Sequence, residues 1–159
     1  MQPSRILPDL QCSLVCQDIR VETNGNFFLI GVLDVVRVAQ VPVTAFLLNV
    51  FNRWTAGVGQ FVEAVRLLAP DQTTVLHQGG TRFAMRNPNL NATTVTSFRN
   101  VEFPSAGPYY VEVLVDDVMK VRYPLHIVVV SPPASGQGPA PASQTDSAKP
   151  EAPQTGPPA

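Results

Sequence analysis

Short runs of Val, Phe and Leu alternate with polar residues along most of this chain. Gly, Pro, Asn or Asp interrupts these runs roughly every eight to fifteen residues. The alternation is typical of antiparallel β-strands that bury one face. The pattern predicts strands, some of which should merge, near residues 11–16, 19–23, 26–38, 43–54, 58–68, 73–77, 81–85, 93–103, 108–116 and 119–130.

The number and spacing of these segments predict the fold class and the division of the chain. We expect an all-β domain over residues 11–130, an immunoglobulin-like antiparallel β-sandwich of about seven to nine strands. Residues 1–10 would form an N-terminal extension. Residues 131–159 contain eight of the 16 prolines and no Val, Leu, Ile or aromatic residue. This composition predicts a disordered tail rich in Pro, Ala, Gly and Ser.

The clearest predicted turn lies near the N-terminus, at Asn24-Gly25. This dipeptide favours a two-residue type I′ hairpin, because both of its central residues need positive φ. Such a turn would pair Val21 with Phe28, and the two strands would match apolar to apolar. The apolar residues before and after Gln17-Asp18 differ in parity, which predicts a β-bulge or a kink at that point.

A second predicted hairpin closes the domain within residues 103–130, where the odd-numbered face is apolar. A two-residue turn at Asp116-Asp117 would place Val113 opposite Lys120. A longer loop or a bulge would place Val113 opposite Val121. We prefer the second arrangement, because it keeps apolar residues on one face.

Residues 60–69 fit two kinds of secondary structure. Phe61, Val65 and Leu68 also follow helical spacing, so a helix stays an alternative. A strand is favoured, because a turn-forming segment at 70–72 and a second β-like run follow it.

The charges of the chain exclude two classes of function from our expectations. Ten of the 11 basic residues and ten of the 12 acidic residues lie within residues 1–130, so this part is formally neutral. A nucleic-acid-binding protein that neutralises phosphates needs a basic face. A polybasic membrane anchor needs a cluster of Lys and Arg. We therefore expect neither nucleic acid nor a membrane as partner.

The cysteines indicate a reducing compartment. Cys12 and Cys16 lie four residues apart, so on one strand they would be about 13 Å apart. A disulfide needs Cα atoms within about 7 Å, so two unpaired thiols are expected. The chain also shows no apolar run of signal-peptide or membrane-spanning length. Together these features predict a cytoplasmic protein.

Candidate chemistry is sparse in this sequence. His77 and His126 do not show metal-ligand spacing with the cysteines, so we expect no metal. Neither a glycine-rich phosphate loop nor a nucleophile elbow is found. We therefore expect no enzyme and no cofactor. The leading hypothesis is a non-enzymatic binding or scaffold module whose partner is an unknown protein or a second copy of the chain.

Three polar-loop residues supply the alternative hypothesis. Arg53 and Trp54 precede the loop that leads to Gly59, and Arg82 lies in the second half of the chain. An exposed tryptophan flanked by polar groups forms a platform for a sugar or another small ligand. These residues are therefore candidates for a carbohydrate or small-ligand site. The alternative, which we favour for Trp54, is that its ring packs under its own loop.

Several short motifs occur together along this chain. They are Cys16-Gln17-Asp18-Ile19-Arg20, Asn24-Gly25, Leu29-Ile30-Gly31, the apolar run 43–51, Phe103-Pro104, Gly107 and Tyr109. Together they resemble a family of small, uncharacterised bacterial proteins with an immunoglobulin-like β-sandwich. In that family a Cys-Asp-Asp-Val-Arg-like start leads into a Leu-Ile-Gly strand, and Gln17 here replaces the usual acid. The resemblance covers most of residues 11–130, and it implies the fold and a bacterial cytosolic setting but no activity.

Overall fold

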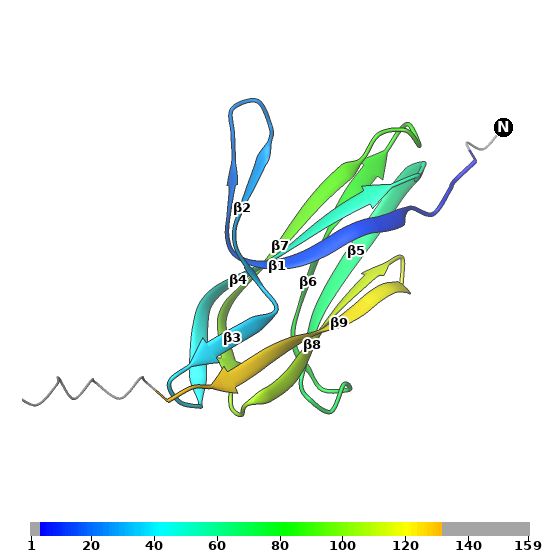
Figure 1. Cartoon of the computed structure of the whole chain (residues 1–159). Coiled ribbons are helices and arrows are strands. Elements are labelled where there is room, and N and C mark those ends of the chain that lie inside the picture. Colours follow the sequence, from blue (N-terminus) through cyan, green and yellow to red (C-terminus); the bar gives the residue numbers. More distant parts are fainter. Residues whose placement is uncertain (1–3, 132–159) are drawn as a thin grey trace, which may run out of the picture.

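A computed structural model describes residues 4–131, which form two β-sheets packed face to face (Figure 1). All regular elements within this range are strands, and their number falls within the expected seven to nine, so the all-β expectation is confirmed. The nine strands are β1 (Asp9–Val21), β2 (Phe27–Leu33), β3 (Val35–Val38), β4 (Val43–Thr55), β5 (Gly59–Leu68), β6 (Val75–Met85), β7 (Ala92–Phe103), β8 (Gly107–Val115) and β9 (Val118–Val129).

The two sheets have the strand orders β2-β1-β4-β7 and β3-β9-β8-β5-β6. All neighbours are antiparallel except β3, which runs parallel to β9. The segment predicted as one strand at 26–38 is divided at Asp34, where the chain crosses from the first sheet to the second. The segments predicted separately at 73–77 and 81–85 belong to the single strand β6.

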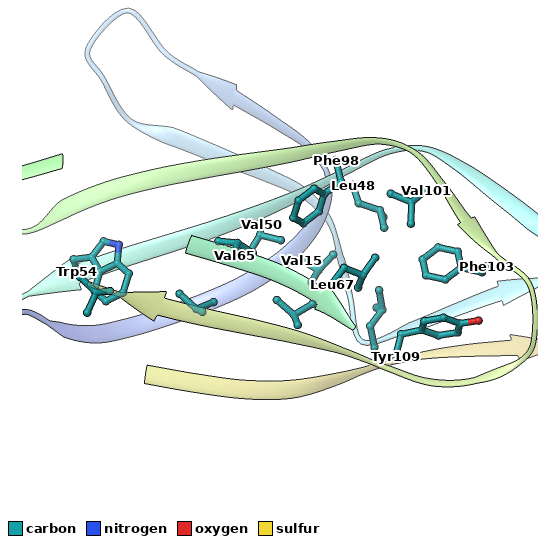
Figure 2. Close-up of a cluster of buried hydrophobic side chains, with 14 of the residues drawn as sticks. Val15, Leu48, Val50, Trp54, Val65, Leu67, Phe98, Val101, Phe103 and Tyr109 are labelled. Carbon is teal, nitrogen blue, oxygen red and sulfur yellow. The ribbon is translucent and has the colours of Figure 1, made fainter. Parts of the chain in front are cut away.

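The core lies between the sheets and is built from large apolar side chains of both (Figure 2). The rings of Phe103 and Tyr109 meet edge to face with their centroids 4.8 Å apart. The Tyr109 hydroxyl donates to the Ser105 carbonyl at 2.9 Å, which satisfies its polar end. Removing this apolar surface from water is the main favourable contribution to folding.

Residues 60–69 lie almost entirely within β5, so the helical alternative is wrong. This strand pairs with both β6 and β8. The side chains of Phe61, Val65 and Leu67 are buried, whereas Val62 is exposed. A period of two therefore describes the segment better than helical spacing.

The turn at Asn24-Gly25 differs from the predicted type I′ turn. Only Gly25 has positive φ, at 87°. The Glu22 amide donates to the Asn26 carbonyl at 2.8 Å, which encloses a three-residue loop. A loop of this length with a left-handed final residue is a common hairpin connection. Val21 consequently pairs with Phe27 and not with Phe28, so the predicted register is wrong by one residue.

The closing hairpin combines the two predicted alternatives. Asp116 and Asp117 both have positive φ, at 46° and 64°, and form a two-residue turn between β8 and β9. The register then shifts between Val113 and Leu114, which places Val113 opposite Val121 as predicted. The bulge therefore restores the apolar face that the short turn alone would disrupt.

The first hairpin bends away from its sheet at Gln17. Pairing of β1 with β4 ends at Cys16, whereas pairing with β2 continues to Val21. Across from Gln17, Gly31 has a φ of 64°, and a Cβ there would lie 2.5 Å from the Gln17 side-chain oxygen. The register with β2 is the same on both sides, so the predicted irregularity is a kink. We call residues 18–30 the arm (Figure 1).

The described residues begin and end at the margins of the predicted domain. Ile6 and Val58 exchange two backbone hydrogen bonds of 2.9 and 3.0 Å, and β1 begins inside the predicted extension, at Asp9. The disordered tail predicted for residues 131–159 lies, apart from its first residue, outside the described range. None of the elements formed by residues 4–131 is a helix that could cross a membrane.

Candidate binding site

The three residues singled out in the sequence lie in different parts of the sandwich. Arg53 and Trp54 are neighbours on β4, and Arg82 is on β6 of the other sheet. Consecutive residues of a strand point to opposite faces of a sheet. Arg53 is accordingly exposed on the outer face, and Trp54 points into the core. The three side chains therefore do not form one site.

Trp54 is a core residue with 0% of its surface exposed. Its ring stacks on Phe83 with the centroids 5.4 Å apart, and Figure 2 shows it at one end of the buried cluster. Its indole Nε1 donates to Glu63 Oε2 at 2.8 Å. The expectation of an exposed aromatic platform is wrong, and the carbohydrate hypothesis built on Trp54 is withdrawn. The favoured alternative, a packed ring, is correct.

Glu63 is a buried carboxylate that the sequence analysis missed. Only 1% of its surface is exposed, and its side chain lies between the sheets. Besides the Trp54 indole, the hydroxyl of Thr94 donates to Oε2 and that of Thr96 donates to Oε1 at 3.3 Å. Three donors replace the hydration that burial removes from the carboxylate. The available signal was the alternation along β5, which places position 63 on the same face as Phe61 and Val65.

A second polar contact crosses the core between Ser13 on β1 and Tyr123 on β9. Their hydroxyl oxygens lie 2.9 Å apart. Burial raises the pKa of Tyr123 to about 12, because the phenolate would lose its hydration. The hydroxyl pair therefore joins the two sheets while Tyr123 is protonated.

The raised pKa of Tyr123 predicts a stability loss at high pH. The folded state holds this proton more tightly than the unfolded chain, so the stabilisation is complete below pH 10 and is lost as pH rises through about 12. We expect urea unfolding to show this loss for the native chain, and to show a smaller one for Tyr123→Phe. If both chains lose equal stability between pH 10 and 12, another group is responsible.

The arm and the outer face of the first sheet enclose a groove of about 530 Å³. One wall is formed by the arm, and the floor is formed by β1, β4 and the start of β7. The rings of Phe27 on the arm and Phe51 on β4 meet edge to face with their centroids 5.5 Å apart, which joins the arm to the floor. We call this space the arm groove, and its lining residues are Cys12, Leu14, Gly25, Asn26, Phe27, Leu29, Phe51, Arg53, Asn91 and Thr93.

The backbone of β2 has hydrogen-bonding groups that no strand uses within the described residues. β2 is the edge of its sheet, with β1 as its only neighbour. The Glu22 amide bonds to the Asn26 carbonyl, and hydrogen-bonded pairs alternate along an antiparallel ladder. The N–H and C=O groups of Phe27 and Leu29 therefore point away from β1. Both residues also line the arm groove.

Arg53 is the one charged residue among those that line the arm groove. It lies across from Cys12 on β1 and from Thr93 on β7. In the amide orientation that satisfies both of its polar atoms, Asn91 accepts from Arg53 Nε at 3.2 Å and from Nη2 at 2.9 Å. Among residues 4–131 no carboxylate lies within ion-pair distance of Arg53. The positive charge is therefore held in place and is not neutralised.

Arg82 lines a different cavity of about 460 Å³ beside β5 and β6. Arg5 forms an ion pair with Asp116 there and places its guanidinium 4.9 Å from the centre of the Phe61 ring. One of the two arginines in this cavity is thus already neutralised. The arm groove offers an unneutralised cation, an apolar floor and a free strand edge together, so we take it as the candidate site.

The two thiols differ in accessibility, and this difference predicts their reactivity. Cys12 is half-buried and lines the arm groove, whereas Cys16 is fully buried and burial raises its pKa. The thiolate is the reactive form. We expect iodoacetamide to modify Cys12 first in the folded chain, as followed by fragmentation of the tryptic peptide 6–20, which contains both cysteines. Equal labelling of both thiols before unfolding would contradict this placement.

The histidines and metal-binding residue types are scattered. The His77 ring lies 5.7 Å from the Phe98 ring, and His126 is exposed on β9. Residues 4–131 contain no group of three or more His, Cys, Asp or Glu side chains placed to hold a metal ion.

Comparison with known proteins identifies a family match. The model of the Family of unknown function (DUF6941) matches residues 11–128, which include nearly all of the sandwich. No curated protein matches the chain.

Proposed function

We propose that this chain, which belongs to the Family of unknown function (DUF6941), is a non-enzymatic binding or scaffold module that holds a protein partner at its arm. The family description carries no activity that could be transferred to the chain. The support for the proposal therefore comes from the surface of the arm.

The arm carries an unusual concentration of exposed apolar side chains, and this observation supports the proposal most directly. Five large residues on it, or immediately after it, are between 38% and 59% exposed. Val21 and Phe27 share one face of the arm, and Phe28 and Ile30 share the other, so both faces present apolar surface to solvent. Large exposed apolar surface marks interaction sites on soluble proteins. The residues are Val21, Phe27, Phe28, Ile30 and Val32.

The sequence of β2 adds to this support. The strand reads Phe-Phe-Leu-Ile-Gly-Val-Leu, with no charge and no proline. Natural edge strands are commonly protected against pairing by charges, prolines or bulges. β2 has only the kink at Gly31. A partner that covers the arm would remove this liability.

The carboxylates of the core support a non-enzymatic role. Glu63 is occupied by Trp54 and two threonines. Glu112 accepts from Arg66 at 3.2 Å and from Arg122 Nε at 2.9 Å. The contacts of Glu63 join the two sheets, and those of Glu112 join β5, β8 and β9 within the second sheet, so both buried acids have a structural use.

We further propose that the module works in the reducing cytosol. Cys12 and Cys16 are both free thiols, and neither lies near another cysteine with which it could pair. Free thiols persist in reducing compartments.

A capture experiment tests the proposed function. The full chain is immobilised, exposed to lysate of its source cells, and compared with Phe28→Glu and with the control Phe46→Glu. Both phenylalanines are exposed, at 53% and 71%, but only Phe28 lies on the arm. We expect at least one protein that the native chain and the Phe46 variant retain, and that Phe28→Glu loses. Analytical ultracentrifugation of the purified chains shows whether that partner is a second copy.

Two results would contradict the proposed function. If Phe28→Glu and the native chain retain the same proteins and sediment alike, while circular dichroism shows both folded, then the arm is not the binding surface. Substrate turnover by the purified chain that one substitution abolishes would contradict the non-enzymatic part of the proposal.

A further inference from the structure

We infer that the arm groove binds a short extended peptide segment, which adds as a strand to β2 and places a carboxylate beside Arg53. This inference rests on the proposed function and specifies the chemistry of its partner. Three features of the groove support it: a free backbone edge, an apolar lining, and one unneutralised charge.

The free backbone edge supplies the main recognition. Phe27 and Leu29 both direct their N–H and C=O groups away from β1, and both line the groove. Two such residues, separated by one, are the repeating unit that an added strand uses. Strand addition of this kind obtains affinity from the main chain and specificity from alternate side chains.

The lining of the groove combines apolar and polar groups. Leu14, Leu29, Phe27 and Phe51 supply apolar surface. Arg53, held by Asn91, lies two residues from Phe51 on the same face of β4 and supplies the polar group. A peptide that follows β2 would place apolar side chains against the first group and a polar group beside Arg53.

The charge of Arg53 determines which polar group the bound peptide must carry. Arg53 is the one charged lining residue, and no carboxylate of residues 4–131 pairs with it. Its guanidinium is oriented by Asn91 before any ligand binds. A planar guanidinium binds a carboxylate through two parallel hydrogen bonds. The ligand therefore carries a carboxylate, either a C-terminus or an Asp or Glu side chain.

The sequence of the tail argues against the chain's own C-terminal residues as the occupant. Residues 131–159 have no Val, Leu, Ile or aromatic residue to place on the apolar floor. The occupant is therefore a segment of another protein.

Selection from a peptide library tests the inference. A library of random peptides with free C-termini is passed over the full chain, and enriched peptides are synthesised with a free or an amidated C-terminus. We expect enriched peptides with alternating apolar residues and a carboxylate. If amidation abolishes binding, the carboxylate is the C-terminus; if it does not, the carboxylate is a side chain. Methylation of alternate backbone nitrogens should abolish binding in either case.

Two arginine variants provide the matched comparison. Arg53→Gln should weaken binding of the enriched peptide about tenfold or more, because one charge-assisted contact is lost. Arg99→Gln is the control, because Arg99 is also exposed on the first sheet and has no ion pair within the described residues. The affinity of Arg99→Gln for the enriched peptide should stay within about twofold of the value for the native chain. Fluorescence anisotropy of the labelled peptide measures both.

The possible failures separate this inference from the proposed function. If no peptide is enriched, or if Arg53→Gln and the N-methylated peptide bind normally, the inference is wrong. Capture of a partner that Phe28→Glu loses would then still support the arm as a binding surface. If both experiments fail, the proposed function is wrong as well. The inference would also be overturned if sedimentation shows that the chain forms a dimer and the enriched peptide does not bind to that dimer.

Discussion

Replacing Gly80 by alanine is expected to lower the free energy of unfolding by about 3 kcal/mol or more. A Cβ at this position would lie 2.0 Å from the backbone oxygen of Glu63 and 3.0 Å from the Cα of Ala64. Both atoms belong to the paired strand β5, so a side-chain rotation cannot relieve the contact. Overpacking against rigid structure commonly costs about 1–3 kcal/mol, and contact with a backbone atom is a severe case.

Gly25→Ala is the control for this substitution. Gly25 has a φ of 87°, and nothing lies within 4 Å of a Cβ built there. Only the strain of a left-handed backbone remains, at about 1–2 kcal/mol. Urea unfolding followed by Trp54 fluorescence measures both variants. A loss at Gly80 no larger than that at Gly25 would show that β5 and β6 can separate at little cost.

Trp54→Ala is the second substitution with a large expected effect, at about 4 kcal/mol. The residue is fully buried, stacks on Phe83 and donates to Glu63. Loss of a buried tryptophan leaves a cavity and typically costs about 3–5 kcal/mol. The variant also deprives a buried carboxylate of one donor. Far-ultraviolet circular dichroism during urea unfolding measures the loss, because the chain has one tryptophan.

Trp54→Phe separates packing from hydrogen bonding. Phenylalanine keeps an aromatic ring against Phe83 and removes the indole N–H. We expect a loss of about 2 kcal/mol, smaller than that of the alanine variant. If the two variants lose the same stability, the hydrogen bond to Glu63 is the dominant contribution of this residue.

The alternation of apolar residues was sufficient to predict the class of fold, but not the details of the turns. The predicted type I′ turn was assigned to Asn24-Gly25 on residue preference. In the structure, two consecutive residues with positive φ form the turn at Asp116-Asp117. Asp tolerates this conformation less readily than Gly, so propensity alone favoured the other site. The bulge between Val113 and Leu114 keeps Val113 opposite Val121, so the apolar faces of β8 and β9 stay aligned although the turn has only two residues.

The division of the strands depended on contacts distant in sequence. Residues 26–38 read as one apolar run, yet the chain changes sheets at Asp34. The partner that draws Val35–Val38 into the second sheet is the last strand, β9. A local pattern contains no information about a partner some ninety residues away, so a single long strand was the natural prediction.

The candidate site was predictable only in part. Arg53 was correctly placed near a strand end, and its exposure followed from its charge. Its association with Trp54 overlooked the alternation of strand side chains, which was available in the sequence. The groove itself depends on the kink at Gln17 and Gly31, because the kink gives the arm its position over the sheet. Glu63 was missed because three donors from other strands make its burial possible.

The parallel pairing of β3 with β9 has a consequence for the order in which the protein is completed during synthesis. Every partner of the first sheet has been made once Phe103 is added, because β1, β2, β4 and β7 all precede that residue. The second sheet waits for Val129, so β3 remains without its partner until nearly the whole domain exists. Contacts between distant segments also form slowly. The first sheet is therefore complete while β8 and β9, which cover part of its inner face in the folded domain, are still missing.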